Sequence, residues 1–364
     1  MSFPANSCNL ENLSNSLDRI ILSEKNIDIS GERIAWFESY LLEALLESFE
    51  ISRDVQFLDK FVKRANYIIR NADIYRNIAD YKGRKRYGFS STKYSIDNKR
   101  VVFLVHTGQI VYPILKFVWI AYSDRTLKEN FSEEIERYLN FSIKAIKDFE
   151  NQLVVKLTNG EDVCFFKWEG DEPIRTDLNS HMPLNFYTSI GRTYIYLYKI
   201  TKDEKYMYLS HCIANYFKKS IHKNIDGSYY WGYRADILRY PQIEDISHGA
   251  IDIDFMILSY DNGIVFTIDD IYGIIKTVKR IIYKDRVYEF LNRGGFVDQS
   301  NANLELQVGR LLELAKYDCE VYRVITPFLC RRINLNSKIH SSVLLGLAKV
   351  IKFSSKCNLE KEVL

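Results

Sequence analysis

The sequence predicts an all-α fold, an (α/α) hairpin toroid of about five to six helical hairpins with one small β-hairpin insertion. Three observations predict this class. Apolar side chains recur with a 3.6-residue period over long segments that come in pairs. Only 16 Gly and 6 Pro occur in 364 residues, so turns are few. Short polar connections also alternate with long aromatic ones, which indicates a ring whose loop-bearing rim carries the function.

The predicted helices follow one another as five hairpins and a last single helix. The turns within pairs are short and polar, as antiparallel neighbours require. Long connections between pairs lie at 74–100, 155–183, 223–247 and 285–301. The expected helices span 31–52 with 54–73, 101–123 with 126–154, 184–200 with 203–222, 248–261 with 267–284, 302–317 with 319–334, and 338–356. We expect the first helix of each pair, which is richer in small and apolar residues, to form the inner ring.

The same pattern sets the expected domain organisation. Residues 1–30 are expected to form an N-terminal arm, 31–357 the single toroid domain, and 358–364 a C-terminal tail. Apolar and polar residues alternate around Asn159-Gly160, which predicts the β-hairpin near 155–171.

The longest apolar stretch, 101–122, is long enough to span a membrane. It contains His106, Gln109 and Lys116, which are expensive to place in lipid. We therefore expect a buried core helix and no membrane span.

Composition and motifs exclude several classes of protein. The 50 basic and 47 acidic residues give a net charge of +3, too small to indicate a nucleic acid partner. No phosphate-binding loop, dinucleotide fingerprint or HExxH motif occurs, so neither a cofactor nor a metal site is predicted.

The N-terminus and the cysteines both bear on the compartment. The first residues lack the features of a secretory signal, which favours a cytoplasmic location, with a specialised secretion route as the alternative. The cysteines have no CxxC spacing, and we expect reduced, mostly buried thiols. They are Cys8, Cys164, Cys212, Cys319, Cys330 and Cys357.

Aromatic and charged residues crowd the connection that precedes the helix at 248–261. Trp231, Tyr230 and Tyr233 lie beside Arg234, and flat amphipathic rings next to charged groups are typical of a surface on which a sugar stacks. We expect Trp231, Tyr230 and Arg234 to bind substrate, and Tyr233 to act in catalysis.

The start of that helix carries an imidazole between carboxylates. His248 and Asp252 are four residues apart and share a helix face, and Glu244 and Asp245 lie one turn earlier. We expect Asp252 to accept a ring N–H of His248 and so to fix its tautomer, with Glu244 and Asp245 as further acid or base groups. The alternative is a capped helix whose histidine is held for structural reasons.

Further candidates lie at the starts of other odd-numbered helices. His181 and Asn185 are again four residues apart, with Tyr187 in the same motif. We expect His181 to be catalytic and Asn185 and Tyr187 to bind substrate, the alternative for His181 being a solvated side chain at a helix cap. His106 is either a substrate-binding group or a satisfied core histidine.

The basic loop Lys82 to Arg86 either lies in solvent or clamps an anionic substrate.

Two stretches, HMPLNFYTSIGRTYIYLYKITKDEKY (181–206) and YYWGYRADILRYPQIEDISHGAIDIDF (229–255), together with the hairpin layout, resemble six-hairpin (α/α) toroid enzymes that act on glycans. That superfamily includes polysaccharide lyases, uronate C5-epimerases and glycosidases. The resemblance implies a central funnel lined by aromatics, with His, Tyr, Asn and Arg or paired carboxylates supplying the chemistry.

The functional prediction that follows is an enzyme that acts on an acidic, uronate-containing glycan by proton abstraction, as a lyase or C5-epimerase. Its partner is an oligo- or polysaccharide. One alternative is a glycoside hydrolase that uses Glu244, Asp245 or Asp252. Another is a non-catalytic toroid that binds a glycan or a protein.

Overall fold

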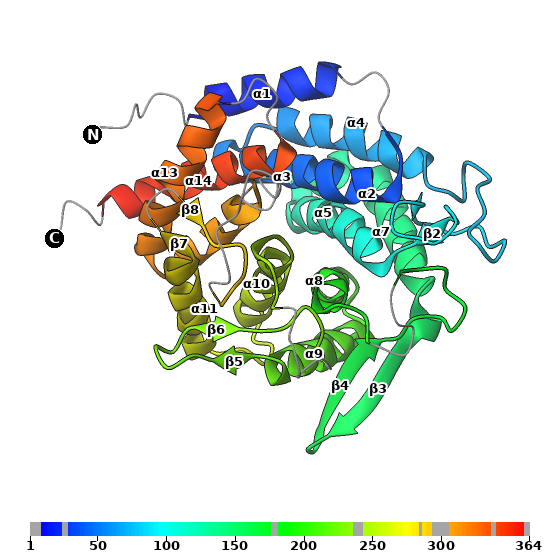
Figure 1. Ribbon diagram of the computed structural model, residues 1–364. Coiled ribbons are helices and arrows are strands. Elements are labelled where there is room, and N and C mark those ends of the chain that lie inside the picture. Colours follow the sequence, from blue (N-terminus) through cyan, green and yellow to red (C-terminus); the bar gives the residue numbers. More distant parts are fainter. Residues whose placement is uncertain are drawn as a thin grey trace.

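The computed structural model describes residues 9–23, 28–175, 181–235, 243–283, 286–292, 306–335 and 340–359. Within these ranges an inner ring of helices packs side by side around one axis and closes on itself (Figure 1). In chain order the ring consists of α3 (Ser39–Ser52), α5 (Leu104–Ser123), α8 (Leu184–Thr201), α10 (Ile246–Asp261), the 3₁₀ helix η5 (Leu306–Lys316) and α14 (Ser341–Leu359), which returns to α3. The predicted all-α toroid is confirmed.

An outer layer of helices covers this ring. The outer helices are α4 (Gln56–Arg70) on α3, α7 (Ser132–Lys147) on α5, α9 (Glu204–Lys219) on α8, α11 (Ile268–Ile281) on α10, and α13 (Cys319–Leu335) on η5. The inner helices α5 and α8 are buried along most of their length, whereas α4 and α7 bury one face each. The expected alternation of inner and outer helices is therefore confirmed.

A further helix, α1 (Leu10–Ser23), completes the outer layer where the sequence predicted only an arm. It packs on α14 and α3. Leu13 and Leu17 lie one turn apart and are fully buried, so this short amphipathic helix joins the core of the ring. The last predicted helix, at 338–356, thus has a partner from the other end of the chain.

The strands form short antiparallel pairs. The longest pair, β3 (Leu153–Thr158) with β4 (Glu161–Phe166), turns at Asn159 and Gly160, whose φ angles of 53° and 79° suit a tight hairpin turn, and it extends beyond the ring (Figure 1). The predicted hairpin is confirmed, although it begins two residues earlier than expected.

Shorter pairs, which the sequence analysis did not predict, shorten the helices expected at 101–123 and 267–284. They are β1 (Ser90–Ser91) with β2 (Val101–Val102), β5 (His222–Lys223) with β6 (Tyr229–Tyr230), and β7 (Ile282–Tyr283) with β8 (Arg286–Val287). Short helical turns fill the remaining connections: α2 (Gly31–Arg33), the π-helical turn η2 (Ile34–Glu38), α6 (Arg125–Asn130) and η3 (Glu150–Gln152).

Of the helices described, α5 is the one long and apolar enough to cross a membrane, and 89% of its apolar window is buried inside the ring. The buried charge of Lys116 on this helix is compensated, because Lys116 donates to Glu47 at 2.8 Å and to Glu50 at 3.4 Å. The position of α5 agrees with the expected core helix.

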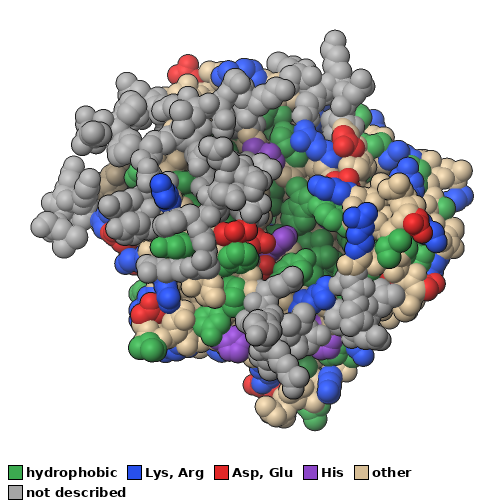
Figure 2. Space-filling model, viewed as in Figure 1, with side chains coloured by type: hydrophobic (Ala, Val, Ile, Leu, Met, Phe, Trp, Pro, Cys, Tyr) green, Lys and Arg blue, Asp and Glu red, His purple; other side chains and the backbone are tan. Residues whose placement is uncertain are grey.

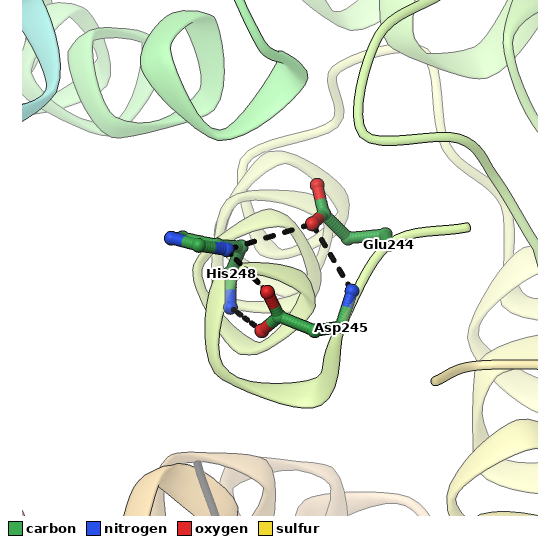
Figure 3. Close-up of side chains that lie close together, drawn as sticks. All are labelled: Glu244, Asp245 and His248. Atoms are coloured by element: carbon green, nitrogen blue, oxygen red, sulfur yellow. Dashed lines mark hydrogen bonds and ion pairs between the residues drawn. The ribbon is translucent and has the colours of Figure 1, made fainter. Parts of the chain in front are cut away.

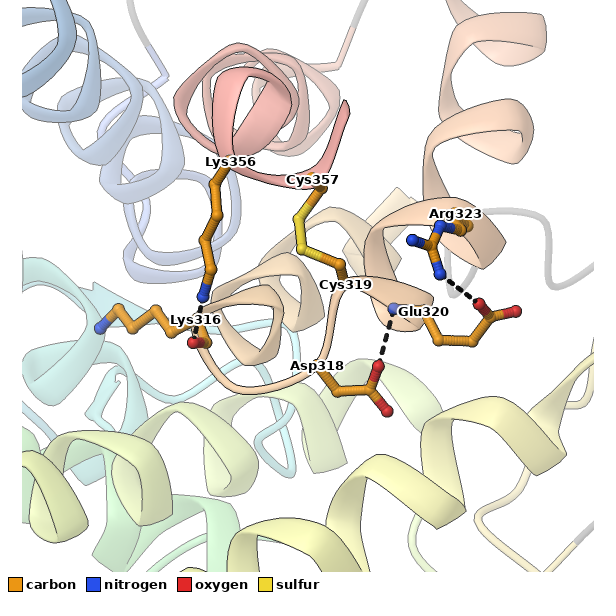
Figure 4. The surroundings of a disulfide bond; sticks show 7 residues. All are labelled: Lys316, Asp318, Cys319, Glu320, Arg323, Lys356 and Cys357. Atoms are coloured by element: carbon orange, nitrogen blue, oxygen red, sulfur yellow. Dashed lines mark hydrogen bonds and ion pairs between the residues drawn. A yellow bond between two sulfur atoms is a disulfide. The ribbon is translucent and has the colours of Figure 1, made fainter. Parts of the chain in front are cut away.

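A disulfide ties the last two helices together. Cys319, at the start of α13, is bonded to Cys357, near the end of α14, across 38 residues of chain (Figure 4). Cys330 is also disulfide-bonded, whereas Cys164 and Cys212 are buried free thiols, and Cys8 lies outside the described residues. The expectation of reduced thiols is therefore wrong for Cys319, Cys330 and Cys357.

The axis of the ring is filled by a buried network of charges. Arg192 on α8 donates to Asp254 on α10 at 2.6 Å and to Gln109 on α5 at 2.7 Å. Arg310 on η5 donates to the same Asp254 at 3.0 Å and to Glu43 on α3 at 2.7 Å. Burial alone would raise the pKa of Asp254, but the two guanidinium groups lower it. Five of the inner elements thus meet in one set of ion pairs and hydrogen bonds.

Asp254→Asn should destabilise the protein by about 3–5 kcal/mol, because it leaves Arg192 and Arg310 buried without a shared anion. Urea unfolding measures the change. The control is Glu129→Gln, which removes the exposed i,i+4 pair with Arg125 and should change the free energy of unfolding by less than about 0.5 kcal/mol. Equal changes in the free energy of unfolding for the two variants would show that the buried network stabilises the protein no more than an exposed ion pair does.

Candidate active site

A cavity of about 590 Å³ opens at the rim where the inner helices begin. Figure 2 shows it as a hollow with an apolar floor, with Lys and Arg side chains gathered on the side of α2 and β2. Its lining includes His106 from the first turn of α5, Asn185 from the first turn of α8 and His248 from the first turn of α10. The cavity therefore lies at the rim to which the sequence analysis assigned the function.

His248 is held by the residue that begins its own helix (Figure 3). Asp245 caps α10, where one carboxylate oxygen accepts the backbone N–H groups of Ser247 and His248 at 2.8 and 3.0 Å. The other oxygen lies 2.6 Å from Nδ1 of the His248 ring. Glu244 lies 3.7 Å from the same nitrogen. Nδ1 therefore carries the proton, and Nε2 points away from both carboxylates.

These contacts shift the pKa of both partners. Burial disfavours the charged imidazole, but the hydrogen bond and the charge of Asp245 outweigh it, so the pKa of His248 is raised above 6.5. Burial likewise opposes ionisation of Asp245, yet its bonds to His248 hold the pKa of this carboxyl below its ordinary value. Asp245 is thus the ionised partner of an imidazole that titrates above its usual range.

Asp252 does not hold His248, and that part of the prediction is wrong. Its two oxygens accept hydrogen bonds from Thr188 Oγ1 at 2.6 Å and from Trp231 Nε1 at 2.8 Å. Asp252 is fully buried, and burial raises its pKa to about 7. The N-cap position places Asp245, rather than the residue one turn onward, beside the ring.

Glu244 is also fully buried. Burial and the neighbouring Asp252 and Asp245 raise its pKa well above 4.5. The ionised form of Glu244 is therefore disfavoured, and the residue does not line the cavity.

A series of rings crosses the cavity floor. The centroids of Tyr233 and His248 are 5.4 Å apart, those of His248 and Trp36 6.3 Å, those of Trp36 and His106 5.7 Å, and those of His106 and Tyr94 5.9 Å. Burial lowers the pKa of His106 to about 3, with the Lys93 charge adding to the effect, so this imidazole is neutral. Burial raises the pKa of Tyr233, so its hydroxyl keeps its proton.

Asn185 presents an unsatisfied amide to the cavity. The residue is 1% exposed, and neither its oxygen nor its nitrogen has a hydrogen-bond partner among the described residues. A buried polar group without a partner costs free energy, which a ligand with a donor and an acceptor would recover. Arg234 lines the same cavity. The loop that carries Tyr233 and Arg234 is tied to α8, because Leu184 donates its N–H to the Tyr233 carbonyl at 2.9 Å.

The structure brings together about half of the predicted set. Tyr233, Arg234, His248, Asn185 and His106 line the cavity, and Asp245 contacts it through His248.

His181, expected to be catalytic, and Trp231, expected to bind substrate, do not line the cavity. The His181 ring stacks on Phe165 with ring centroids 4.3 Å apart, and its Nδ1 is hydrogen-bonded to the Tyr216 hydroxyl at 2.5 Å. Trp231 is fully buried and serves as the donor to Asp252.

Two predicted tyrosines also lie outside the cavity lining. Tyr187 is buried, with its hydroxyl donating to the Met182 carbonyl. Tyr230 packs against His222, with ring centroids 5.3 Å apart.

Several lining residues were not singled out in the sequence. Trp36 lies on the π-helical turn η2, an irregularity that often marks functional sites but leaves no periodic signal. Lys93, Tyr94, Trp168 and Arg175 also line the cavity. All four belong to the long connections at 74–100 and 155–183, so their place in those connections was the signal that could have found them.

The basic loop does not reach the cavity. Lys82 and Arg84 are bonded to Glu169 at 2.6 and 2.7 Å, and Arg86 donates to the Asp148 carbonyl. None of Lys82 to Arg86 lines the cavity, so the structure places them in ion pairs and solvent rather than in a substrate clamp.

Glu244, Asp245 and His248 are the described residues that come close enough together to hold a metal ion, with one ligand atom each within 4.8 Å. Their hydrogen bonds account for this closeness, because the ring nitrogen that faces the carboxylates carries the proton that Asp245 accepts.

No family model and no curated protein sequence matches this chain, but solved structures share its fold. An α-1,6-mannanase of Salegentibacter sp., solved as an inactive variant with two adjacent aspartates replaced and with α-1,6-mannotriose bound, is 12% identical, with a TM-score of 0.59 over 96% of this chain and 100% of that chain. A family 76 glycoside hydrolase from a bovine Bacteroides thetaiotaomicron strain is 10% identical, with a TM-score of 0.53 over 96% of this chain and 78% of that one. A polysaccharide lyase is 10% identical, with a TM-score of 0.53 over 96% and 99%. The protein thus has the (α/α) toroid fold found among glycan-active enzymes.

Asp245→Asn should lower the pKa of His248 by about one unit or more, because it removes the neighbouring negative charge while an asparagine still caps the helix. NMR titration of the histidine ring signals measures this shift. The control is Asp203→Asn, which changes the capping aspartate of α9 and should leave His248 unchanged.

The same pair fixes a pH dependence of stability. A raised folded-state pKa means that the contribution of His248 is fully present below pH about 6.5 and is lost as the pH rises through the folded-state pKa. Asp245→Asn should remove this dependence. An unchanged His248 pKa in Asp245→Asn would contradict the assignment of the pair.

Proposed function

We propose that this protein is a carbohydrate-active enzyme that binds an acidic, uronate-containing glycan and removes the C5 proton of a uronate, as a lyase or a C5-epimerase does. One observation carries the proposal. The cavity holds an aspartate-paired imidazole, a tyrosine hydroxyl and an unpartnered amide, and no carboxylate is among the described residues that line it.

His248 is the proposed base. With Nδ1–H donated to Asp245, the lone pair of Nε2 is the one available to a substrate. The carboxylate of Asp245 orients the ring and stabilises the imidazolium that forms when the C5 proton is taken. The neutral imidazole is the active form, so the rate should increase with pH through the raised pKa of His248.

Tyr233 is the proposed acid. In the lyase reaction the electron pair of the C5–H bond forms the C4–C5 double bond, and the C4–O bond to the leaving sugar breaks. The leaving oxygen takes the hydroxyl proton of Tyr233, which its raised pKa keeps in place until that step. In the epimerase reaction no C–O bond breaks, and a proton returns to C5 from the opposite face.

Asn185 and Arg234 are the proposed partners of the uronate carboxylate. Removing a C5 proton places negative charge on the adjacent carboxylate, and donors already in position stabilise that charge. The amide of Asn185 has no other partner among the described residues, and the guanidinium of Arg234 offers paired N–H donors to a carboxylate.

A glycoside hydrolase is the second candidate, and the names of the neighbouring structures favour it over a lyase. The mannanase was inactivated by replacing two adjacent aspartates, and Glu244 and Asp245 are adjacent carboxylates near this cavity. In this chain, however, Glu244 and Asp252 are fully buried and do not line the cavity, and Asp245 is bonded to His248. A hydrolase needs two carboxyl groups that flank the scissile bond.

The experiment that separates these functions combines three readouts on two kinds of substrate. Polyuronates are assayed for the ultraviolet absorbance of an unsaturated product and for exchange of the C5 hydrogen with solvent, and α-1,6-mannan is assayed for released reducing ends. We expect absorbance or exchange on a polyuronate and no hydrolysis of mannan. Hydrolysis of mannan alone would establish the second candidate, and no turnover of any glycan would favour a binding scaffold.

His248→Ala should lower kcat at least about a thousandfold with folding intact, and Tyr233→Phe should have a comparable effect on the lyase reaction, because each removes a proton-transfer group. Circular dichroism checks the fold of both variants. The matched control is Tyr230→Phe, which removes a hydroxyl from the same loop outside the cavity and should leave kcat within about twofold. A His248→Ala variant with full activity would contradict the role of His248 as the base.

For the compartment we propose an oxidising environment rather than the cytoplasm, because Cys319 and Cys357 are disulfide-bonded and such bonds persist in oxidising environments.

Cys319→Ser/Cys357→Ser should lower the free energy of unfolding by about 2–4 kcal/mol, since the bond closes a long loop. Reduction of the unaltered protein should lower it at least as much, because it also breaks the disulfide of Cys330. Denaturant unfolding measures both changes. Thiol counting on protein purified without reductant tests the compartment: free thiols at Cys319 and Cys357 would contradict the proposal.

A further inference from the structure

One wall of the cavity carries two cations that the proposed reaction does not use. Lys93 lies in the connection between β1 and β2, and Arg175 lies in the stretch after β4. The two segments are joined, because Ser95 pairs with Ile174 in an antiparallel bridge and Ile96 donates its N–H to the Pro173 carbonyl at 2.7 Å. Lys93 and Arg175 therefore belong to one continuous wall.

Neither cation forms an ion pair with a residue that the structure describes, and both side chains are exposed. The nearby cations Lys82 and Arg84, in contrast, are each paired with Glu169. Since the described lining of the cavity contains no carboxylate, an anion that enters it meets two uncompensated charges on this wall.

The cations of this wall are not among the residues that hold the proposed base. Lys93 Nζ lies 5.3 Å from the centre of the Tyr94 ring, and the rings of His106 and Trp36 follow in turn between Tyr94 and His248. The charge of Lys93 acts on His106, whereas the pKa of His248 is set by burial and by Asp245 and Asp252. Lys93 is therefore not among the charges that act on the pKa of His248.

We propose that Lys93 and Arg175 form a second anion-binding subsite, which holds the carboxylate of the sugar next to the uronate at His248. The cavity of about 590 Å³ exceeds the size of one sugar ring, and its aromatic floor extends from one subsite to the other. The preferred substrate is then a run of consecutive acidic sugars rather than one uronate among neutral sugars. This inference rests on the proposed function and specifies its substrate.

The test measures binding to two tetrasaccharides that differ only in charge pattern, one composed entirely of uronates and one in which uronates alternate with neutral sugars. Binding is measured by isothermal titration calorimetry. Every variant also carries His248→Ala, which prevents turnover of the substrate. Lys93→Gln/Arg175→Gln removes the proposed subsite. The control, Lys85→Gln/Lys156→Gln, removes two exposed lysines outside the cavity lining and so keeps the loss of net charge equal.

Lys93→Gln/Arg175→Gln should raise the Kd for the all-uronate tetrasaccharide about tenfold or more and the Kd for the alternating one less than about threefold, because each lost charge-assisted contact acts on the neighbouring carboxylate only. The control should change neither Kd by more than about twofold. Equal losses for both tetrasaccharides, or no loss for either, would overturn the second subsite while leaving the proposed function in place. If α-1,6-mannotriose binds and neither uronate tetrasaccharide does, the proposed function itself fails.

Discussion

The buried contact of Asp254 with Arg192 and Arg310 is the constraint on which the rest of the ring depends. A closed ring of helices encloses an axis that side chains must fill, and charges are tolerated there only when each has a partner. These contacts fix α3, α8, α10 and η5 relative to one another, since a shift along the axis by one turn would separate them. The first turns of the inner helices therefore stay level at one rim, where the cavity lies.

Charged residues also gather at the opposite end of the ring. A cavity of about 310 Å³ at this end is bordered by ion pairs. Glu47 pairs with Lys116 and Lys352, and Glu313 pairs with Lys349. Nearby lysines lower the pKa of Glu47, although burial opposes ionisation. Mutual pairing neutralises most of this end, whereas Lys93 and Arg175 at the functional rim form no ion pair with a described residue. The two ends thus differ in charge content as well: the described lining of the rim cavity has basic residues and no carboxylate, whereas the lining of the opposite cavity has both.

Periodicity predicted outer helices such as α4, because they bury one face, and a nearly unbroken apolar run predicted α5, because it is buried on most sides. Periodicity missed α1, whose role depends on α14 more than 300 residues later, and no local pattern reports such a contact. At the site, residue type identified His248 and Tyr233 correctly as cavity residues. It misplaced Trp231, because an indole that donates to a buried carboxylate and one that stacks on a sugar look alike in sequence.

The start of α10 shows why residue type alone left the chemistry open. Glu244, Asp245 and Asp252 are three carboxyl groups within nine residues, and residue type alone does not distinguish their ionisation. Their surroundings distinguish them. Burial raises the pKa of Glu244 and of Asp252, whereas hydrogen bonds to His248 lower the pKa of Asp245 at the helix cap. A single ionised carboxylate bound to His248 supports a histidine that transfers protons, whereas a carboxylate pair around a glycosidic bond would require Glu244 or Asp252 to reach the cavity. The position of the cap, more than the number of acids, therefore favours proton abstraction.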